Sequence, residues 1–255
     1  MGKIYGGVSG TAREVKAIYA GVNGVAKAVK KVYAGVNGVA KLIWPTGGAV
    51  LPAEYQQVLY IQSSGTQYID VGMGITVTSS AMSFDINMDM EFISIPAGSA
   101  GNILSGTRNS GSGSSIQRYY TAVNGTGWYL GAGTSSTQSS VKPIVGQLYN
   151  VVTHFNYGSH TLSIDGTTVV TRNVNSLNIT RNLYLFRYNY SDPAYTSMKL
   201  YKCKITTQDG IQRNYYPCYR KSDSVAGLYD LANDVFYPNA GTGSFTAGPI
   251  NEGPL

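Results

Sequence analysis

Apolar and polar residues alternate strictly over residues 84–92, in the segment FDINMDMEF. Successive side chains of a β-strand point to opposite sides, so one face carries the five apolar residues. The other face carries Asp85, Asn87, Asp89 and Glu91. This pattern predicts a strand in an antiparallel sheet that is buried on one side and solvated on the other.

Further short segments have the apolar spacing and the β-branched or aromatic residues that are typical of strands. They cover residues 116–123, 127–130, 148–155, 161–164, 168–171, 183–188 and 198–206. Turn signals such as Gly-Ser-Gly-Ser, Asn-Gly and Asp-Gly separate several of them, and no helical period of useful length appears. Many short strands with regular turns predict an all-β, two-sheet sandwich or jelly roll over residues 51–255.

The pattern differs in residues 1–44, which repeat with a period of 14 residues starting at Tyr5, Tyr19 and Tyr33. Each copy places Val-Ser-Gly-Thr or Val-Asn-Gly-Val between short apolar runs, and Asn-Gly accommodates the positive φ angles of a two-residue hairpin turn. Each copy is therefore predicted to form a small β-unit. A unit of this size cannot bury its apolar face alone, so we expect residues 1–44 to form an assembly segment, with a homotrimer as the preferred state.

A Pro/Gly break follows the repeat at Trp44-Pro45-Thr46-Gly47-Gly48. Proline and glycine interrupt regular structure, so this break marks a boundary between domains. We therefore divide the chain into an assembly segment at 1–44, a linker at 45–50 and a β-sandwich domain at 51–255.

The net charge of +6 is concentrated in the repeat, where seven basic residues oppose one acidic residue. The remaining chain has 12 basic and 12 acidic side chains, so it has no overall basic excess with which to hold phosphates. We interpret the lysines of the repeat as protection of its strand edges, and we expect no nucleic-acid partner. The abundance of glycine (31 residues) and tyrosine (21 residues) agrees with a β-rich, turn-rich chain.

No segment has the 18 or so consecutive apolar residues of a membrane helix, and the N-terminus lacks the apolar core of a signal peptide. We therefore expect synthesis in a cytoplasm and no membrane partner. The two cysteines, Cys203 and Cys218, are too few for a disulfide framework or a zinc site, so we expect buried free thiols.

Several segments resemble a known family. They include EYQQVLYIQSSGTQYIDVG, GQLYNVVTHFNYGSHTLSIDGTTV and YYPCYRKSDSVAGLYDLANDVFYPNAGTGSF. These are similar to the concanavalin A-like, laminin G-type domains of structural proteins in tailed phages and prophages, and the N-terminal repeat resembles segments that precede such domains. The resemblance implies a jelly-roll fold and a virion setting, while the ligand site stays open because this family's loops diverge.

The acidic face of residues 85–91 is the feature closest to an enzyme site. Jelly-roll glycoside hydrolases of the laminarinase type carry Glu-x-Asp-x-Glu on a strand, and their paired carboxylates act as nucleophile and acid. Here Asn87 occupies the nucleophile position, and an amide cannot form the glycosyl-enzyme intermediate. A solvated outer face that tolerates Asp89→Asn and Glu91→Gln is the preferred interpretation, so we predict no catalysis.

Metal and cofactor signals are weak. The two histidines, His154 and His160, lie in no serine-nucleophile or metal-ligand motif, so we interpret both as structural. Laminin G-like domains often bind calcium, for which Asp70, Asp165 and Asp192 are candidates, but no dense acidic loop is present. We therefore predict neither a metal ion nor a cofactor.

A mixture of aromatic and polar residues between positions 108 and 129 is the preferred candidate for a ligand site. Sugars have apolar CH faces and a rim of hydroxyls, so lectin sites combine flat rings with Arg, Asn or Asp. We predict a carbohydrate site with Trp128 at a surface, composed of Arg108, Asn109, Arg118, Tyr119, Tyr120, Asn124, Trp128 and Tyr129. The alternative is that many of these rings belong to the core, because tyrosine side chains are often half buried. A second stretch with the same mixture of aromatic and polar residues covers residues 187–192.

Together these features predict a virion protein, either a tail or head fibre, whose jelly-roll domain binds a carbohydrate on the host surface. Residues 1–44 would join three copies and attach them to other virion proteins. The leading alternative is a structural or decoration protein whose jelly-roll domain binds another virion protein. A glycan hydrolase is the third and weakest hypothesis.

Overall fold

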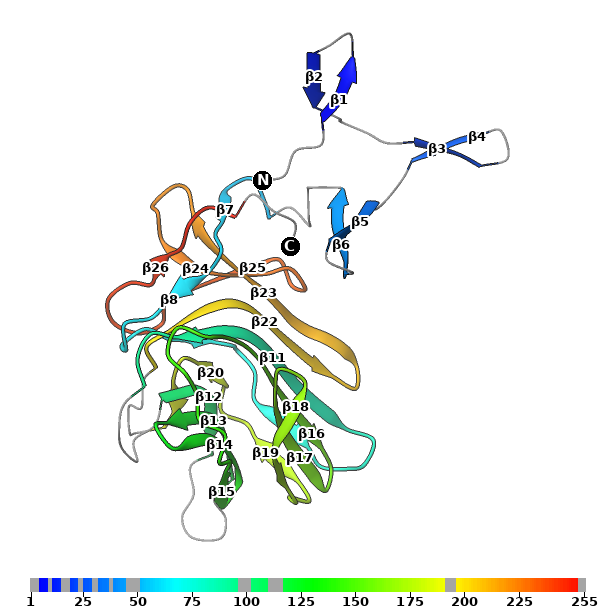
Figure 1. Cartoon of the computed structure of the whole chain (residues 1–255). Helices are drawn as coiled ribbons and strands as arrows, with labels where there is room; N and C mark the ends of the chain where they lie inside the picture. Colours follow the sequence, from blue (N-terminus) through cyan, green and yellow to red (C-terminus); the bar gives the residue numbers. More distant parts are fainter. Residues whose placement is uncertain are drawn as a thin grey trace. The chain divides into compact units, whose positions relative to one another are not determined.

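The computed structural model describes residues 5–8, 11–14, 19–22, 25–28, 32–36, 39–44, 51–95, 102–109, 117–190 and 196–251. All regular elements among these residues are β-strands, which confirms the predicted all-β class (Figure 1). The chain divides into two compact units, of which unit 1 comprises Met1–Pro52 with Asn251–Leu255, and unit 2 comprises Ala53–Ile250.

Unit 1 contains three antiparallel hairpins, one for each copy of the 14-residue repeat. Their strands are β1 (Tyr5–Val8) with β2 (Thr11–Glu14), β3 (Tyr19–Val22) with β4 (Val25–Ala28), and β5 (Val32–Val36) with β6 (Val39–Trp44). Val22 pairs with Val25, and Val36 pairs with Val39, which is the register of the predicted two-residue connections. The Asn-Gly pairs themselves lie outside the described residues. The sequence therefore correctly predicted a β-repeat.

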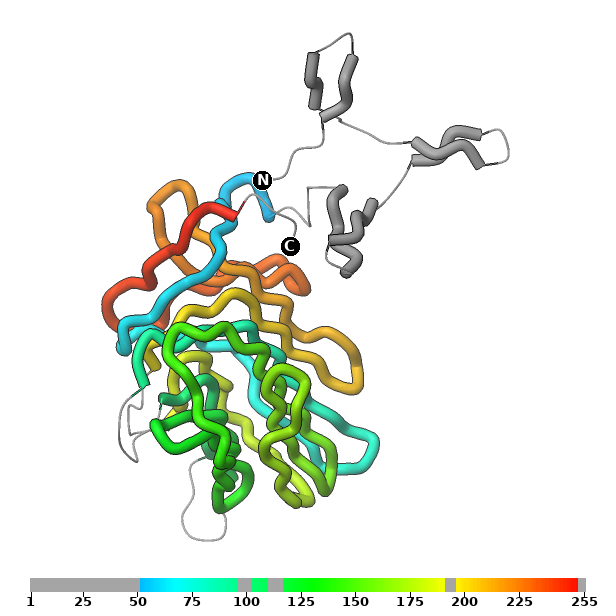
Figure 2. Tube along the Cα trace, viewed as in Figure 1, coloured from blue at the N-terminus to red at the C-terminus, as the bar shows by residue number. Residues whose placement is uncertain are grey.

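The larger sheet of unit 2 is built around β11, the strand with strict alternation. Its order is β18 (Thr167–Arg172), β17 (Ser159–Ile164), β16 (Leu148–Asn156), β11 (Ser83–Phe92), β22 (Met198–Thr207), β23 (Gly210–Arg220), β24 (Ala226–Asp230) and β25 (Val235–Pro238). The short strands β7 (Tyr55–Gln57), β8 (Ile61–Gln62) and β26 (Thr246–Ala247) also join it. Figure 2 shows the first and last parts of unit 2, cyan and red, side by side, where β8 pairs with β26.

The smaller sheet has the order β15 (Ser135–Gln138), β14 (Gly127–Gly133), β13 (Arg118–Asn124), β12 (Asn102–Arg108), β20 (Tyr184–Leu185) and β9 (Ile69–Asp70). One strand, β21 (Tyr188–Asn189), pairs with β12 in parallel, whereas the other described pairings of this sheet are antiparallel. Strands β10 (Ile75–Val77) and β19 (Leu177–Ile179) form a separate pair. The smaller sheet carries the candidate site described below.

The core lies between the inner faces of the two sheets. The five apolar residues of β11 are all buried, as the alternation predicts, and their polar neighbours are more exposed. From the smaller sheet, Tyr119 and Trp128 enter the same core. The Tyr119 hydroxyl lies 2.9 Å from Thr153 Oγ1 on β16 of the larger sheet. Side chains of the two sheets thus interdigitate as in a β-sandwich.

The segment 183–188, predicted as one strand, is divided into β20 and β21. The break falls at the buried residue Phe186, whose φ is 68°. A positive φ is unfavourable for a residue with a side chain, and it redirects the chain here. As a result β20 runs antiparallel to β12, and β21 runs parallel to it. This redirection brings Tyr188 beside β12.

Candidate functional site

The outer face of the smaller sheet carries arginine and tyrosine side chains. Alternation along β13 sends Tyr119 into the core and places Arg118 and Tyr120 on the opposite face. On the neighbouring strand β12, Arg108 pairs directly with Arg118, and Gly106 pairs directly with Tyr120. Directly paired residues share a face, so Arg108, Arg118 and Tyr120 all lie on the outer side.

Glycines allow two tyrosine rings to lie close to the sheet. A Cβ atom on Gly131 would overlap the ring of Tyr120, and one on Gly106 would lie 2.7 Å from Cδ2 of Tyr188. Glycine has no Cβ, so it leaves room for the two rings. Glycine inside a strand often marks a site where another group approaches closely. The rings of Tyr120 and Tyr188 meet edge to face, with centroids 5.7 Å apart. They form a partly exposed aromatic platform on the sheet.

The platform continues through Tyr190 to Arg108. The Tyr188 and Tyr190 ring centroids are 6.1 Å apart. The guanidinium carbon of Arg108 lies 3.9 Å from the centre of the Tyr190 ring, a cation–π contact. We call the group Arg108, Arg118, Tyr120, Tyr188 and Tyr190 the Arg–Tyr surface. It unites the first candidate stretch with part of the second, whose residues Ser191 and Asp192 lie outside the described residues.

Burial and neighbouring charges act on the Tyr188 phenol in opposite directions. Burial raises the pKa of Tyr188 to about 12, although the nearby charges of Arg118 and Arg108 act to lower it. The phenol is therefore neutral at physiological pH. Its oxygen is buried and has no hydrogen-bond partner among the described residues, and the same holds for Nε of Arg108 and Nε of Arg118. Arg118 also donates a hydrogen bond from Nη2 to the carbonyl of Thr134.

The prediction that Trp128 lies at a surface is wrong. Trp128 is fully buried, and its ring packs against Phe92 and Tyr149, with centroids 5.6 Å and 5.1 Å away. Tyr119 is also fully buried, and its hydroxyl lies within hydrogen-bond distance of Ser105, Thr121 and Thr153. Both residues therefore stabilise the sandwich and cannot contact a ligand at the outer face.

Asn124 and Asn109 both form hydrogen bonds to the backbone, and Asn124 is buried, whereas Asn109 is partly exposed. Asn124 Oδ1 accepts hydrogen bonds from the backbone nitrogens of Thr126 (2.9 Å) and Gly127 (3.2 Å), while Nδ2 donates to the Tyr129 hydroxyl at 2.8 Å. This is the Asx-type turn that Asn-Gly sequences favour. Asn109 Oδ1 accepts a hydrogen bond from the backbone nitrogen of Gln117 at 2.7 Å. Tyr129 stays partly exposed on the outer face, opposite Ala122.

The sequence pattern did not reveal that Gly106 and Gly131 make room for the tyrosine rings, or that the two candidate stretches meet. Gly106 and Gly131 interrupt segments that otherwise read as strands. An isolated glycine inside a strand pattern indicates a bulge or a close approach by another group. The two glycines therefore indicate a close approach, but the sequence does not identify the approaching group.

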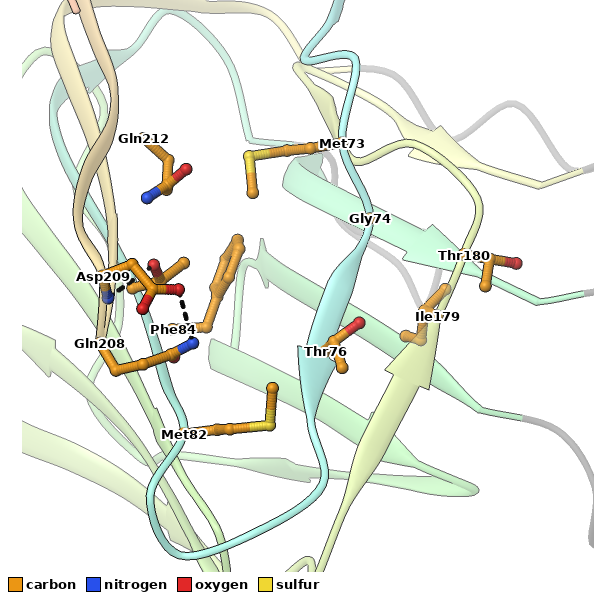
Figure 3. Close-up of a pocket in the computed structure, with 11 residues that line it drawn as sticks. Met73, Gly74, Thr76, Met82, Phe84, Ile179, Thr180, Gln208, Asp209 and Gln212 are labelled. Atoms are coloured by element: carbon orange, nitrogen blue, oxygen red, sulfur yellow. Dashed lines mark hydrogen bonds between the residues drawn. The ribbon is translucent and has the colours of Figure 1, made fainter.

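A hollow of about 420 Å³ lies near the start of β11 (Figure 3). Its interior is apolar, with Met73, Met82 and Phe84 pointing into it, and its rim is polar. At the rim, Gln208 Nε2 donates a hydrogen bond to Asp209 Oδ2 at 2.9 Å. Polar side chains such as Thr76, Asp209 and Gln212 line the rim, but no guanidinium group is among the described lining residues. The Arg–Tyr surface combines aromatic rings with such donors, so it is the better candidate.

The carboxylates of β11 are engaged by neighbouring side chains. Glu91 contacts Lys199 Nζ at 2.7 Å and the Tyr201 hydroxyl at 2.8 Å. Burial opposes ionisation of Glu91, but these hydrogen bonds outweigh burial and keep its pKa below the usual value. Asp85 pairs with His154, and Asp89 accepts a hydrogen bond from Asn150 at 2.7 Å. The predicted outer face is present, but it is paired rather than simply solvated.

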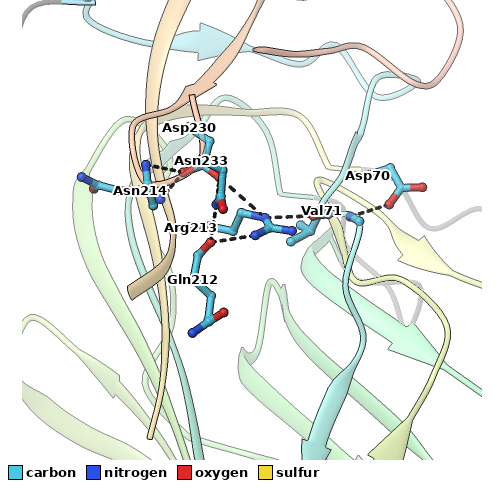
Figure 4. A network of polar contacts seen from close by, with 9 residues as sticks. Asp70, Val71, Gln212, Arg213, Asn214, Asp230 and Asn233 are labelled. Atoms are coloured by element: carbon cyan, nitrogen blue, oxygen red, sulfur yellow. Dashed lines mark hydrogen bonds and ion pairs between the residues drawn. The ribbon is translucent and has the colours of Figure 1, made fainter. Parts of the chain in front are cut away.

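Another buried carboxylate, Asp230, belongs to a structural network (Figure 4). Its Oδ1 accepts hydrogen bonds from the backbone nitrogens of Asn214 (2.8 Å) and Ala232 (3.0 Å), and Arg213 Nε lies 3.7 Å from its Oδ2. Arg213 also donates to the carbonyl of Val71 at 3.1 Å. The network ties the β23–β24 hairpin to the chain after β9, so Asp230 holds the fold together.

The described residues contain no group of three or more His, Cys, Asp or Glu side chains that could hold a metal ion. Of the calcium candidates, Asp70 and Asp165 each accept a backbone hydrogen bond, from Gly72 (2.9 Å) and Asn150 (2.8 Å). Asp192 lies outside the described residues.

Both cysteines are buried free thiols, as predicted, and burial raises the pKa of Cys218 to about 12. No helix long and apolar enough to cross a membrane occurs in the described ranges.

Comparison with known proteins relates the chain to solved structures only. No family model and no curated protein matches it. It is similar to a protein of Bacteroides ovatus ATCC 8483 that is provisionally assigned as a carbohydrate-binding protein, with a TM-score of 0.55 and 11% identity. That match covers 78% of this chain and 62% of the other, so this chain spans less than two thirds of its relative. A lower similarity, with a TM-score of 0.40 and 12% identity, relates it to domains LG4-5 of the mouse laminin α1 chain, covering 71% and 48%.

At this level of identity the comparison shows the fold alone. The two packed sheets and this similarity agree with the all-β, sandwich-like jelly-roll fold that the sequence predicts for unit 2. The chemistry of a ligand has to be argued from the side chains of the site itself.

Proposed function

We propose that unit 2 binds carbohydrate through the Arg–Tyr surface. The observation that carries this proposal is the aromatic platform itself, in which Tyr120 and Tyr188 lie against Gly131 and Gly106. Neither ring belongs to the set of fully buried aromatic residues that form the core. Glycine costs stability inside a strand, and here it creates room for two partly exposed rings rather than for core packing.

The arrangement suits a sugar for two reasons. Aromatic rings offer an apolar surface to the CH face of a pyranose, and guanidinium groups donate several hydrogen bonds to its hydroxyl rim. Both kinds of group lie together on one face of a rigid sheet, which preorganises them for binding. The fold agrees with this proposal, since the similar Bacteroides protein is provisionally assigned as carbohydrate-binding.

A glycan array with the full chain tests this proposal. We expect saturable binding to at least one glycan, and a loss of about tenfold or more in affinity for Tyr120→Ala and for Tyr188→Ala, the scale seen for aromatic anchors at interfaces. Tyr157→Ala is the matched control, because Tyr157 is 44% exposed at the turn between β16 and β17. An array without binding, or equal losses in all three variants, would contradict the proposal.

We further propose that the protein belongs to a virion and that the bound carbohydrate lies on a host surface. The support is the sequence resemblance to phage structural proteins and the three-hairpin repeat before the sandwich. In this proposal residues 1–44 join copies of the chain, with a trimer as the preferred state, and attach them to other virion proteins. Antibody labelling of virions from a producing host tests it, and unlabelled particles would count against it.

Two alternatives give different outcomes in the same assays. A structural or decoration protein would show no glycan binding and would instead bind a purified virion protein. A hydrolase would release reducing ends from a bacterial polysaccharide. We expect no such release, since Glu91 and Asp85 are held by Lys199 and His154, and Asn87 cannot act as a nucleophile.

A further inference from the structure

We propose that the Arg–Tyr surface selects glycans that carry an acidic group, a carboxylate, sulfate or phosphate, over their neutral counterparts. This inference rests on the carbohydrate binding proposed above and specifies the chemistry of the ligand. Its central observation is the direct pairing of two like charges, Arg108 on β12 and Arg118 on β13.

Direct pairing of two cations on one face of a sheet is unfavourable. Directly opposed residues have Cβ atoms about 5 Å apart, and like charges at this distance destabilise the pair. Proteins usually relieve such a contact with a carboxylate. The ion pairs among the described residues instead involve His154, Lys199, Arg213 and Arg220, and none reaches either arginine of this pair.

A third cation strengthens the positive field at this edge of the sheet. Arg172 of β18 donates to Thr137 Oγ1 (2.7 Å) and Ser135 Oγ (2.8 Å), beside β14 and β15. Burial lowers the pKa of Arg172, Tyr120 acts to raise it, and the positive charge of Arg118 acts to lower it. Both arginines contact the segment 132–137, since Arg118 donates to the Thr134 carbonyl. The positive charge is a local feature, because the chain beyond residue 44 has equal numbers of acidic and basic side chains.

The geometry also places the anion relative to the sugar ring. Arg118 and Tyr120 are two residues apart on the same face of β13, which corresponds to about 7 Å along a strand. Arg108 is held on the Tyr190 ring at 3.9 Å, and a guanidinium stacked in this way keeps its N–H edge for a planar anion. A sugar on the Tyr120 and Tyr188 rings would thus direct an acidic substituent toward the arginine pair. Guanidinium groups bind carboxylate, sulfate and phosphate oxygens through paired N–H donors.

Matched polysaccharides measure this selectivity in the full chain. Polygalacturonate and its fully methyl-esterified form differ in the carboxylate, and dextran sulfate and dextran differ in the sulfate. A phosphate-substituted mannan and its dephosphorylated form complete the set. We expect the protein to bind at least one acidic member ten times or more tightly than its neutral partner, with affinity that falls as salt increases. The series in which this occurs identifies the anion.

Point variants distinguish the preference for acidic glycans from carbohydrate binding itself. Arg108→Gln and Arg118→Gln should each remove most of the preference for the acidic partner, while residual binding to the neutral partner persists. Tyr120→Ala should weaken binding to both partners. Lys142→Gln removes one exposed positive charge elsewhere and should change neither.

Other outcomes would refute the acidic preference alone or the carbohydrate binding as well. Equal affinity for both members in all three pairs would refute the acidic preference and leave carbohydrate binding intact. An equal loss of preference in Lys142→Gln would show that net charge alone attracts the polymer, which also refutes it. If glycan binding is absent from the array and from all three pairs, both proposals fail.

Discussion

At the scale of single residues, His160 illustrates how burial sets chemistry in this sandwich. Its side chain is fully buried, packs against Phe155 with ring centroids 3.8 Å apart, and contacts the carbonyl of Val174 through Nε2 at 3.1 Å. Nδ1 is buried and has no partner among the described residues. Since a carbonyl only accepts, Nε2 carries the proton, and protonation of Nδ1 would add an unpaired buried donor. Burial therefore lowers the pKa of His160 to about 4.

This shift predicts a loss of stability on acidification. Below pH 6.5 the unfolded chain binds a proton at this histidine, whereas the folded protein does not until the pH approaches 4. The free energy of unfolding should therefore decrease as the pH falls between these values. Urea denaturation at several pH values measures it, and His160→Gln, which retains a donor for Val174, should show a shallower dependence. The same slope in the two proteins would contradict this account.

At the scale of elements, strand pairing and strand composition create the Arg–Tyr surface together. The parallel pairing of β21 with β12 brings Tyr188 over Gly106, and the antiparallel pairing of β13 with β14 brings Tyr120 over Gly131. In each case a glycine on one strand receives the ring of another. The platform therefore depends on the register of these strands as well as on the tyrosines.

A glycine substitution tests this dependence. We expect Gly131→Ala to displace the Tyr120 ring and to reduce glycan affinity about tenfold, because a Cβ would overlap the ring. Gly125→Ala is the matched control, since a Cβ at Gly125 has no neighbour within 4 Å. Affinity is measured by titration, and circular dichroism verifies the fold of each variant. Unchanged affinity in Gly131→Ala would mean that ligand does not contact Tyr120.

At the scale of the whole molecule, the chain combines a sandwich that buries its own core with three separate hairpins. Unit 2 buries a continuous apolar cluster between its sheets. Each hairpin of unit 1 is a separate two-stranded sheet. Isolated two-stranded hairpins are marginally stable in water, so we expect copies of the repeat to gain stability by association.

We therefore predict that residues 1–44 determine the oligomeric state. Light scattering should give a trimer for the full chain and a monomer for a variant that begins at Gly47. Circular dichroism of the shortened chain provides the control, because it should retain a cooperative β-sheet unfolding transition. If both proteins are monomeric across micromolar concentrations, the proposed assembly is refuted.

The sequence alone determined the local features of this protein. Alternation with a period of two assigned one face of β11 to the core, and the repeat with its Val-Asn-Gly-Val segments predicted the hairpins of unit 1. The buried free state of Cys203 and Cys218 also followed from their small number. These features depend on backbone geometry and on neighbours within a few residues, which a single sequence contains.

Only the tertiary structure decided which candidate residues face outward. Both faces of β13 and β14 carry aromatic residues, so alternation separates Tyr119 from Tyr120, and Trp128 from Tyr129, but does not say which side is buried. The larger sheet decided this by covering Tyr119 and Trp128. Likewise, the turn at Phe186 and the parallel pairing of β21 joined Tyr188 to Tyr120, a contact between residues far apart in sequence. Such contacts arise from packing and strand pairing across the whole domain, and local pattern does not encode them.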